Sequence, residues 1–93
     1  MIIGIVTARL HFPDAQCLKD KRRILRSLLD RIMNRMNVSV AEVGDQNLWQ
    51  VAEVAFVTVA AESVQVQERI SALAKILQSD FRFVLLDINT KIL

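Results

Sequence analysis

Four basic residues are the first feature of this sequence that could perform chemistry. They recur at the i, i+3, i+4, i+7 spacing that places side chains on one face of a helix. They are Lys19, Arg22, Arg23 and Arg26. Because several cations on one face can neutralise the phosphates of RNA, we predict that this set contacts a nucleic acid. The alternative is a solvated helix face whose charge only keeps the protein in solution.

The positive charge is local to one stretch of the chain. Leu18 to Met36 contains seven of the twelve Lys and Arg residues and two Asp residues, a net charge of +5, whereas the whole chain carries only +2. An anionic partner responds to this local excess more than to the net charge of the whole chain. We therefore include Lys21, Arg31 and Arg35 as supporting candidates for contact with RNA.

Lys21 is the least expected of these cations. On a helical wheel it falls near the apolar stripe instead of the basic face. Its alkyl stem could pack at the helix edge while its amine reaches water. Alternatively, Lys19 and Lys21 could present positive charge beside the free N–H groups of the first turn, which would hold a phosphate.

No arrangement of residues for catalysis or metal binding can be assembled from the sequence. His11 is the only histidine and has no Cys or carboxylate at a metal-ligand spacing. Cys17 has no visible His or Asp partner, and we expect Glu42 and Asp45 to pair with basic residues or to cap a turn. We therefore predict a protein that is not an enzyme, needs no cofactor and has no small-molecule substrate.

Hydrophobic periodicity predicts six elements that would position these residues. Alternation and β-branched residues favour strands at Ile2–Phe12, Val38–Val43, Val51–Ala60 and Phe81–Ile88. Apolar residues at helical spacing favour two helices, one over Leu18–Met36 and one from an N-cap at Ser63 to about Gln78. The tail after Ile88 either extends the last strand or frays.

The order of these elements, β-α-β-β-α-β, predicts an α+β fold. Each β-α-β unit needs a right-handed crossover, and the two central strands form a hairpin. The economical solution is one ferredoxin-like sandwich over residues 1–93. Two helices would cover one face of a four-stranded antiparallel sheet with strand order 4-1-3-2.

This arrangement leaves the other face of the sheet uncovered. By register, that face carries alternate residues of the first and third strands, among them Ile3, Ile5, Val57 and Val59. Since a large apolar patch on a monomer usually marks an interface, we predict that a second copy or another protein packs there. Trp49 is expected to bury against the end of the sheet. If it is exposed, it would anchor a protein or a base, so it is a further interface candidate.

Composition limits the remaining possibilities. A hydrophobic content of 53% with 24% charged residues is typical of a globular domain, and a single Cys excludes an internal disulfide. The apolar amino-terminal stretch follows no basic segment and is interrupted by Arg9 and His11. We therefore interpret it as a strand and not as a signal peptide or a membrane span. A cytoplasmic location without a membrane partner is expected.

Three segments of the chain resemble a known family. They are the start MIIGIVTARLHFP, the run from Cys17 to Arg23 followed by Leu25, and the run from Asn37 to Val43 followed by Leu48-Trp49-Gln50. In combination they resemble the YlxP-like family of small bacterial proteins, a domain of unknown function. The sequence departs from the family pattern where Cys17 replaces a typical Ser and Asp20 replaces a typical Glu.

The resemblance implies a ferredoxin-like fold, in agreement with the periodicity. Genes of the family often lie beside those of translation initiation and ribosome maturation factors, which implies a role connected with RNA or the ribosome. No catalytic residues are implied.

Two hypotheses for the function follow. The leading one is a cytoplasmic module that binds ribosomal or other RNA through the basic helix. The alternative is a protein-interaction module that forms a homodimer or docks on a partner through the apolar open face. The salt concentration distinguishes the two hypotheses, because screening weakens binding to RNA and barely affects an apolar protein contact.

Overall fold

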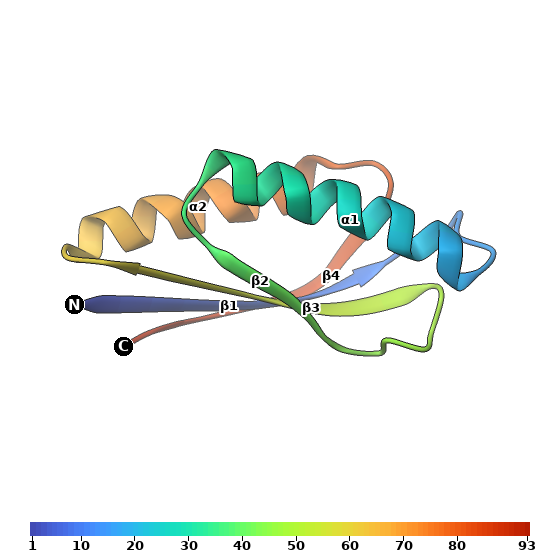
Figure 1. Cartoon of the computed structure of the whole chain (residues 1–93), viewed down its shortest axis with the longest axis horizontal. Helices are drawn as coiled ribbons and strands as arrows, with labels where there is room; N and C mark the ends of the chain where they lie inside the picture. Colours follow the sequence, from blue (N-terminus) through green and yellow to red (C-terminus); the bar gives the residue numbers. More distant parts are fainter.

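The computed structural model describes all residues from 1 to 93. It contains four strands and two helices in the predicted order (Figure 1). Their bounds are β1 Ile2–His11, α1 Leu18–Arg35, β2 Ser39–Gly44, β3 Val51–Ala60, α2 Ser63–Ser79 and β4 Val84–Ile92.

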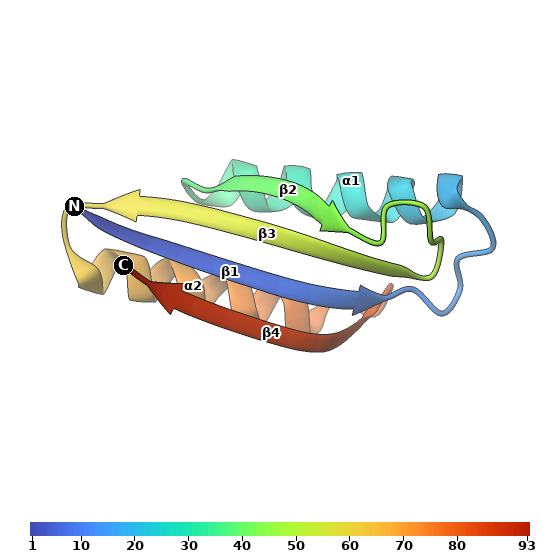
Figure 2. The same ribbon diagram turned by 90° about the horizontal axis from the view of Figure 1, so that it is seen from below.

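The four strands form one antiparallel sheet in the order β2-β3-β1-β4, which confirms the predicted ferredoxin-like topology. Both helices lie on the same side of this sheet (Figure 1). Seen from the sheet side, α1 lies behind β2 and α2 lies behind β1 and β4 (Figure 2). The opposite face of the sheet therefore has no helix over it.

The apolar side chains on one face of the sheet pack against the apolar stripes of the two helices and form one core. Residues facing the helices are buried, and Ala8 of β1 pairs with Val54 of β3 in its middle. The main members are Val6, Ala8, Leu10, Leu25, Leu28, Ile32, Ala52, Val54, Phe56, Leu73 and Leu77. Phe56 is buried, so its aromatic ring faces the helices and is absent from the open face.

The predicted boundaries differ from the observed ones by one residue at β1, α1, β2 and α2, and by three residues at the start of β4. Glu62, not Ser63, is the N-cap of α2, and its backbone N–H donates to the Gln65 side chain over 3.4 Å. The alternation of Phe81 and Phe83 resembles a strand, but β4 begins only at Val84. A turn precedes it, in which Phe81 is 97% exposed and Phe83 is buried.

The carboxyl-terminal tail extends β4 to Ile92 and does not fray. Leu93 continues the ladder beyond the strand, since its N–H and C=O both bond to Ile3, over 2.8 and 3.1 Å. No helix in the structure is both long and apolar enough to cross a membrane.

Candidate nucleic-acid interface

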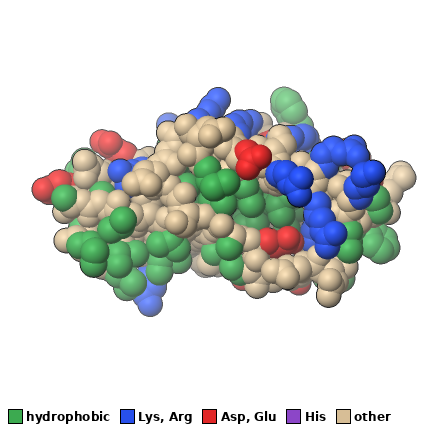
Figure 3. Space-filling view, viewed as in Figure 1, with side chains coloured by type: hydrophobic (Ala, Val, Ile, Leu, Met, Phe, Trp, Pro, Cys, Tyr) green, Lys and Arg blue, Asp and Glu red, His purple; other side chains and the backbone are tan.

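Four predicted contact residues lie together on the outward side of α1. Their side chains are exposed and line one shallow depression with Ser27 and Asp30. We call this set the outer basic face; it consists of Lys19, Arg22, Arg23 and Arg26. Lys and Arg side chains gather on this side of the molecule in the space-filling view (Figure 3).

No cation of the outer basic face forms an ion pair. The four ion pairs of the structure, each closer than 4.0 Å, involve the cations Arg9, Lys21, Arg31 and Arg82, and none involves this set. Asp30 lines the same depression without closing an ion pair there. Because the cations are unpaired, an approaching anion would not have to displace a carboxylate of the protein.

Lys21 does not belong to this face, and both interpretations of it from the sequence are corrected. Its side chain is 0% exposed. The amine lies 2.9 Å from Glu42 Oε2 and donates to the carbonyl oxygens of Asp45 and Val51 over 2.9 and 3.0 Å. The amine is fully buried and makes two hydrogen bonds and one ion pair inside the protein, so it neither reaches water nor holds a phosphate.

The Lys21 contacts fasten the hairpin loop to the helix. Asp45 and Val51 stand at the two ends of the β2–β3 connection, and Glu42 lies on β2. Asp45 has a positive φ of 60°, and its carboxylate pairs with Arg9 over 3.1 Å. The prediction that Glu42 and Asp45 pair with basic residues is confirmed. The charges serve to position α1 against the sheet.

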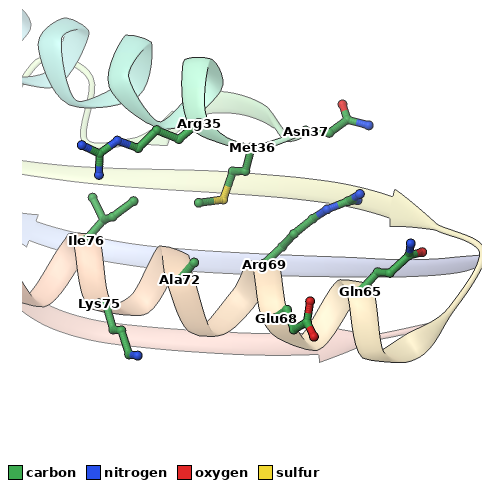
Figure 4. A pocket seen from close by; sticks show the side chains of 9 residues that line it. All are labelled: Arg35, Met36, Asn37, Gln65, Glu68, Arg69, Ala72, Lys75 and Ile76. Atoms are coloured by element: carbon green, nitrogen blue, oxygen red, sulfur yellow. The ribbon is translucent and has the colours of Figure 1, made fainter.

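Arg31 and Arg35 point away from the outer basic face. Arg31 Nη2 lies 3.8 Å from Asp80 Oδ2, on the side facing the turn before β4. Arg35 lies at the end of α1 and lines a groove between the two helices (Figure 4). The structure therefore separates the seven predicted cations into one set of four, one buried residue and two residues in other surroundings.

Arg82, which was not predicted from the sequence, lies beside the basic helix. Its guanidinium binds Asp80 through Nη2 to Oδ2 at 2.7 Å and Nε to Oδ1 at 3.0 Å, and donates from Nη1 to Ser27 Oγ at 3.1 Å. The hydrogen bonds from Arg82, and more weakly the charge of Arg31, lower the pKa of Asp80 below its ordinary value of 3.8. A carboxylate and an arginine two positions apart were the available signal in the sequence.

Two basic residues of α2 were likewise not predicted from the sequence to belong to a site. Arg69 donates from Nη1 to Thr58 Oγ1 and to the Val59 carbonyl over 2.8 and 2.9 Å, and Thr58 in turn donates to the Asn37 carbonyl over 2.7 Å. Arg69 and Lys75 line the groove that also contains Arg35. Their positions lie more than thirty residues from Arg35, so only the fold brings them together.

The open sheet face carries the other predicted set. Ile3 pairs with Val59 and Ile5 with Val57, so these four side chains lie together at one end of the face. Val57 and Val59 are 41% and 46% exposed. Trp49 is 48% exposed in the β2–β3 loop, beyond the opposite end of β3, so its predicted burial is wrong and it does not join this patch.

Cys17 and His11 have no chemical partners that would make them reactive. Cys17 occupies the N-cap of α1 without a side-chain hydrogen bond, as expected for a poor cap. Asp20 instead accepts the backbone N–H of Gln16 over 3.0 Å. No group of three or more His, Cys, Asp and Glu side chains is close enough to hold a metal ion.

Fold and surface together define a small α+β protein of ferredoxin-like topology, with a basic first helix and one uncovered sheet face. Within this class the chain belongs to the family described as "Protein of unknown function (DUF503)", whose model matches residues 3–90. It is similar to the "Uncharacterized protein YlxP" of Bacillus subtilis (strain 168), with 31% identity over 78 residues, which cover 84% of this chain and 85% of the relative. The resemblance expected from the three sequence segments is thereby confirmed.

Proposed function

We propose that this protein is a non-enzymatic cytoplasmic module that binds RNA, with ribosomal RNA as the leading candidate, through the outer basic face of α1. One observation carries the proposal. Four exposed cations line a single depression, and none has a carboxylate within ion-pair distance. Uncompensated cations release counterions from a phosphate backbone without first breaking an ion pair of the protein.

The dimensions of this face suit a backbone contact. At a rise of 1.5 Å per residue, Lys19 and Arg26 are separated by about 11 Å along the helix axis. A strand lying over this length would meet cations on both flanks of the depression. Contacts to phosphate position a nucleic acid but do not read its bases, so we expect weak sequence selectivity at this face.

The proposal is tested by sedimentation of ribosomal subunits and total RNA with the protein over a series of salt concentrations. The variant Lys19/Arg22/Arg23/Arg26→Glu reverses the charge of the whole face, and its circular dichroism spectrum establishes that it is folded. We expect the wild-type protein to co-sediment at low salt and to be released as salt rises, because screening weakens phosphate contacts. Equal binding by both proteins, or none by either, would contradict the proposal.

A second candidate function is association with another protein through the open sheet face. The observation in its favour is the exposed apolar patch formed by Ile3, Ile5, Val57 and Val59. Such a patch favours a homodimer or a docking site. Sedimentation equilibrium at micromolar concentration tests the homodimer: Val57→Lys should then reduce the average mass, whereas Val64→Lys, at a 59% exposed position on α2, should not. A monomeric wild-type protein would contradict it.

A further inference from the structure

A groove of about 720 Å³ lies between α1 and α2. Figure 4 shows how its side chains lie. Its middle is apolar, formed by Met36 after the end of α1 and by Ala72 and Ile76 of α2. Its volume lies within the range of roughly 300–1,000 Å³ that is usual for small-ligand sites.

Cationic groups flank this apolar middle. In Figure 4 the Arg35 side chain extends over Ile76, while the Arg69 side chain extends toward Asn37, with Met36 between them. Neither guanidinium has a carboxylate within ion-pair distance. Glu68 on the rim is the one acidic lining residue, and with Lys75 the lining carries three positive charges against one negative.

Arg69 is held in place before any ligand arrives. Its Nη1 donates to Thr58 and to the Val59 carbonyl, which leaves the N–H groups of Nε and Nη2 without a protein acceptor. A preorganised arginine loses less side-chain entropy on binding an anion than a free one. Arg35 makes no hydrogen bond or ion pair, so its guanidinium is available as well.

The order of the groups along the groove is cation, apolar surface, cation. A nucleotide inside a single strand presents the same three groups, because its ribose carries a 5′ and a 3′ phosphate on its two sides and a flat base projects from the sugar. We infer that the groove binds one unstacked nucleotide of single-stranded RNA, with the base on Met36, Ala72 and Ile76 and the two phosphates at Arg35 and Arg69. The inference rests on the proposed function, since the strand would be the one that follows the outer basic face.

Recognition of an unstacked base gives this site a role different from that of the outer basic face. RNA-binding proteins read sequence mainly from splayed bases in single strands, and phosphate contacts alone cannot supply this. Arg35 is the last residue of α1, so it also links the groove to the helix that carries the outer basic face.

Nuclear magnetic resonance titration of the full-length, isotopically labelled protein tests the inference. The probes are adenosine 3′,5′-bisphosphate, which carries both phosphates, adenosine 5′-monophosphate and pyrophosphate. We expect the bisphosphate to shift the side-chain amides of Asn37 and Gln65 and the backbone amide of Ala72. It should bind at least about tenfold more tightly than the monophosphate, since one charge-assisted contact is added. A single-stranded hexanucleotide should shift the same signals, which distinguishes the strand from the free nucleotide as the source.

Three variants locate the site. Arg35→Glu should abolish the shifts, and it is expected to fold because the native side chain has no partner to lose. Ala72→Phe fills the exposed floor without changing charge and should also abolish them. Lys91→Glu, on the other face of the sheet, should leave them unchanged.

The results separate this inference from the proposed function. Arg22→Glu/Arg23→Glu should weaken binding of long RNA but leave the bisphosphate shifts in the groove intact. Shifts in the groove without any loss of RNA binding in that variant would contradict the proposed function alone. Absence of shifts in the groove at millimolar bisphosphate, or equal affinity for pyrophosphate, would overturn the inference while leaving the outer basic face untouched.

Discussion

Replacement of Lys21 by Met tests the account of the buried lysine. The substitution keeps an apolar stem of similar length but removes the ammonium that meets Glu42 at 2.9 Å and donates to two carbonyl oxygens. Removal of one partner from a buried ion pair costs about 3–5 kcal/mol. The Glu42 side chain is 20% exposed, so water relieves part of this penalty. We therefore expect the free energy of unfolding to fall by about 2–4 kcal/mol.

This loss is large relative to the stability of the whole protein. At about 0.05–0.15 kcal/mol per residue, a chain of 93 residues is stable by roughly 5–14 kcal/mol. With a urea dependence of about 1.5 kcal/mol per molar, a loss of 3 kcal/mol lowers the unfolding midpoint by about 2 M. Urea denaturation at neutral pH, followed by circular dichroism, measures the change.

Two further variants complete this test. Lys21→Met combined with Glu42→Leu removes both charges, so the double variant should be more stable than the sum of the single losses predicts, by about 0.5–3 kcal/mol. Lys19→Met changes an exposed lysine of the same helix and should alter stability by no more than about 0.5 kcal/mol. For RNA binding we expect the opposite: Lys19→Met weakens it and Lys21→Met does not, since only Lys19 lies on the outer basic face. A Lys21→Met protein as stable as the wild type would refute the reasoning.

Three other substitutions have expected outcomes. Cys17→Ser should stabilise the protein by about 1 kcal/mol in urea denaturation, because a hydroxyl can cap the free N–H groups at the start of α1; an unchanged midpoint would contradict this. Asp80→Asn should destabilise the protein at neutral pH, since it removes the ion pair with Arg82. The lowered native pKa of Asp80 means that its stabilisation is complete above the ordinary value of 3.8 and is lost as pH falls through the lower native value, so the unfolding curves of wild type and variant should approach one another below pH 3.8 and converge once the pH is below that native value. A difference that persists there would show another cause. Phe56→Ala should cost about 3–5 kcal/mol because the ring is 1% exposed, whereas Phe81→Ala, at a position 97% exposed, should change the midpoint little; similar losses in both would contradict the assigned core.

The sequence predicted the elements and their topology because these depend on local patterns. The period-two register of a strand assigned Ile3 and Ile5 to one face of the sheet, although the residues alternate only loosely. The hairpin together with two right-handed crossovers left one economical strand order. The predicted start of β4 was wrong because Phe81 and Phe83 alternate as in a strand, whereas the strand begins at Val84. The hydrogen bonds between Asp80 and Arg82 stabilise a turn there instead.

The candidate site was predictable only in part, for a physical reason. Helical spacing grouped the four outer cations, since their neighbours lie three or four positions away in the same helix. Lys21 could not be assigned, because its three partners come from the hairpin, 21 to 30 residues later. The groove depends on Arg35 and Arg69, whose proximity arises only when the two helices pack on one sheet.

The most direct test of the outer basic face is the salt dependence of its affinity for RNA. Fluorescence anisotropy of a labelled single-stranded RNA gives the dissociation constant of wild type, Arg22→Glu and Lys91→Glu from low to physiological salt. Four phosphate contacts predict a slope of log affinity against log salt of about −2.8, and loss of Arg22 should reduce its size by about 0.7. Lys91→Glu makes the same change in charge on the open sheet face and should keep the wild-type slope. Equal slopes for the two variants, or an affinity independent of salt, would contradict the account.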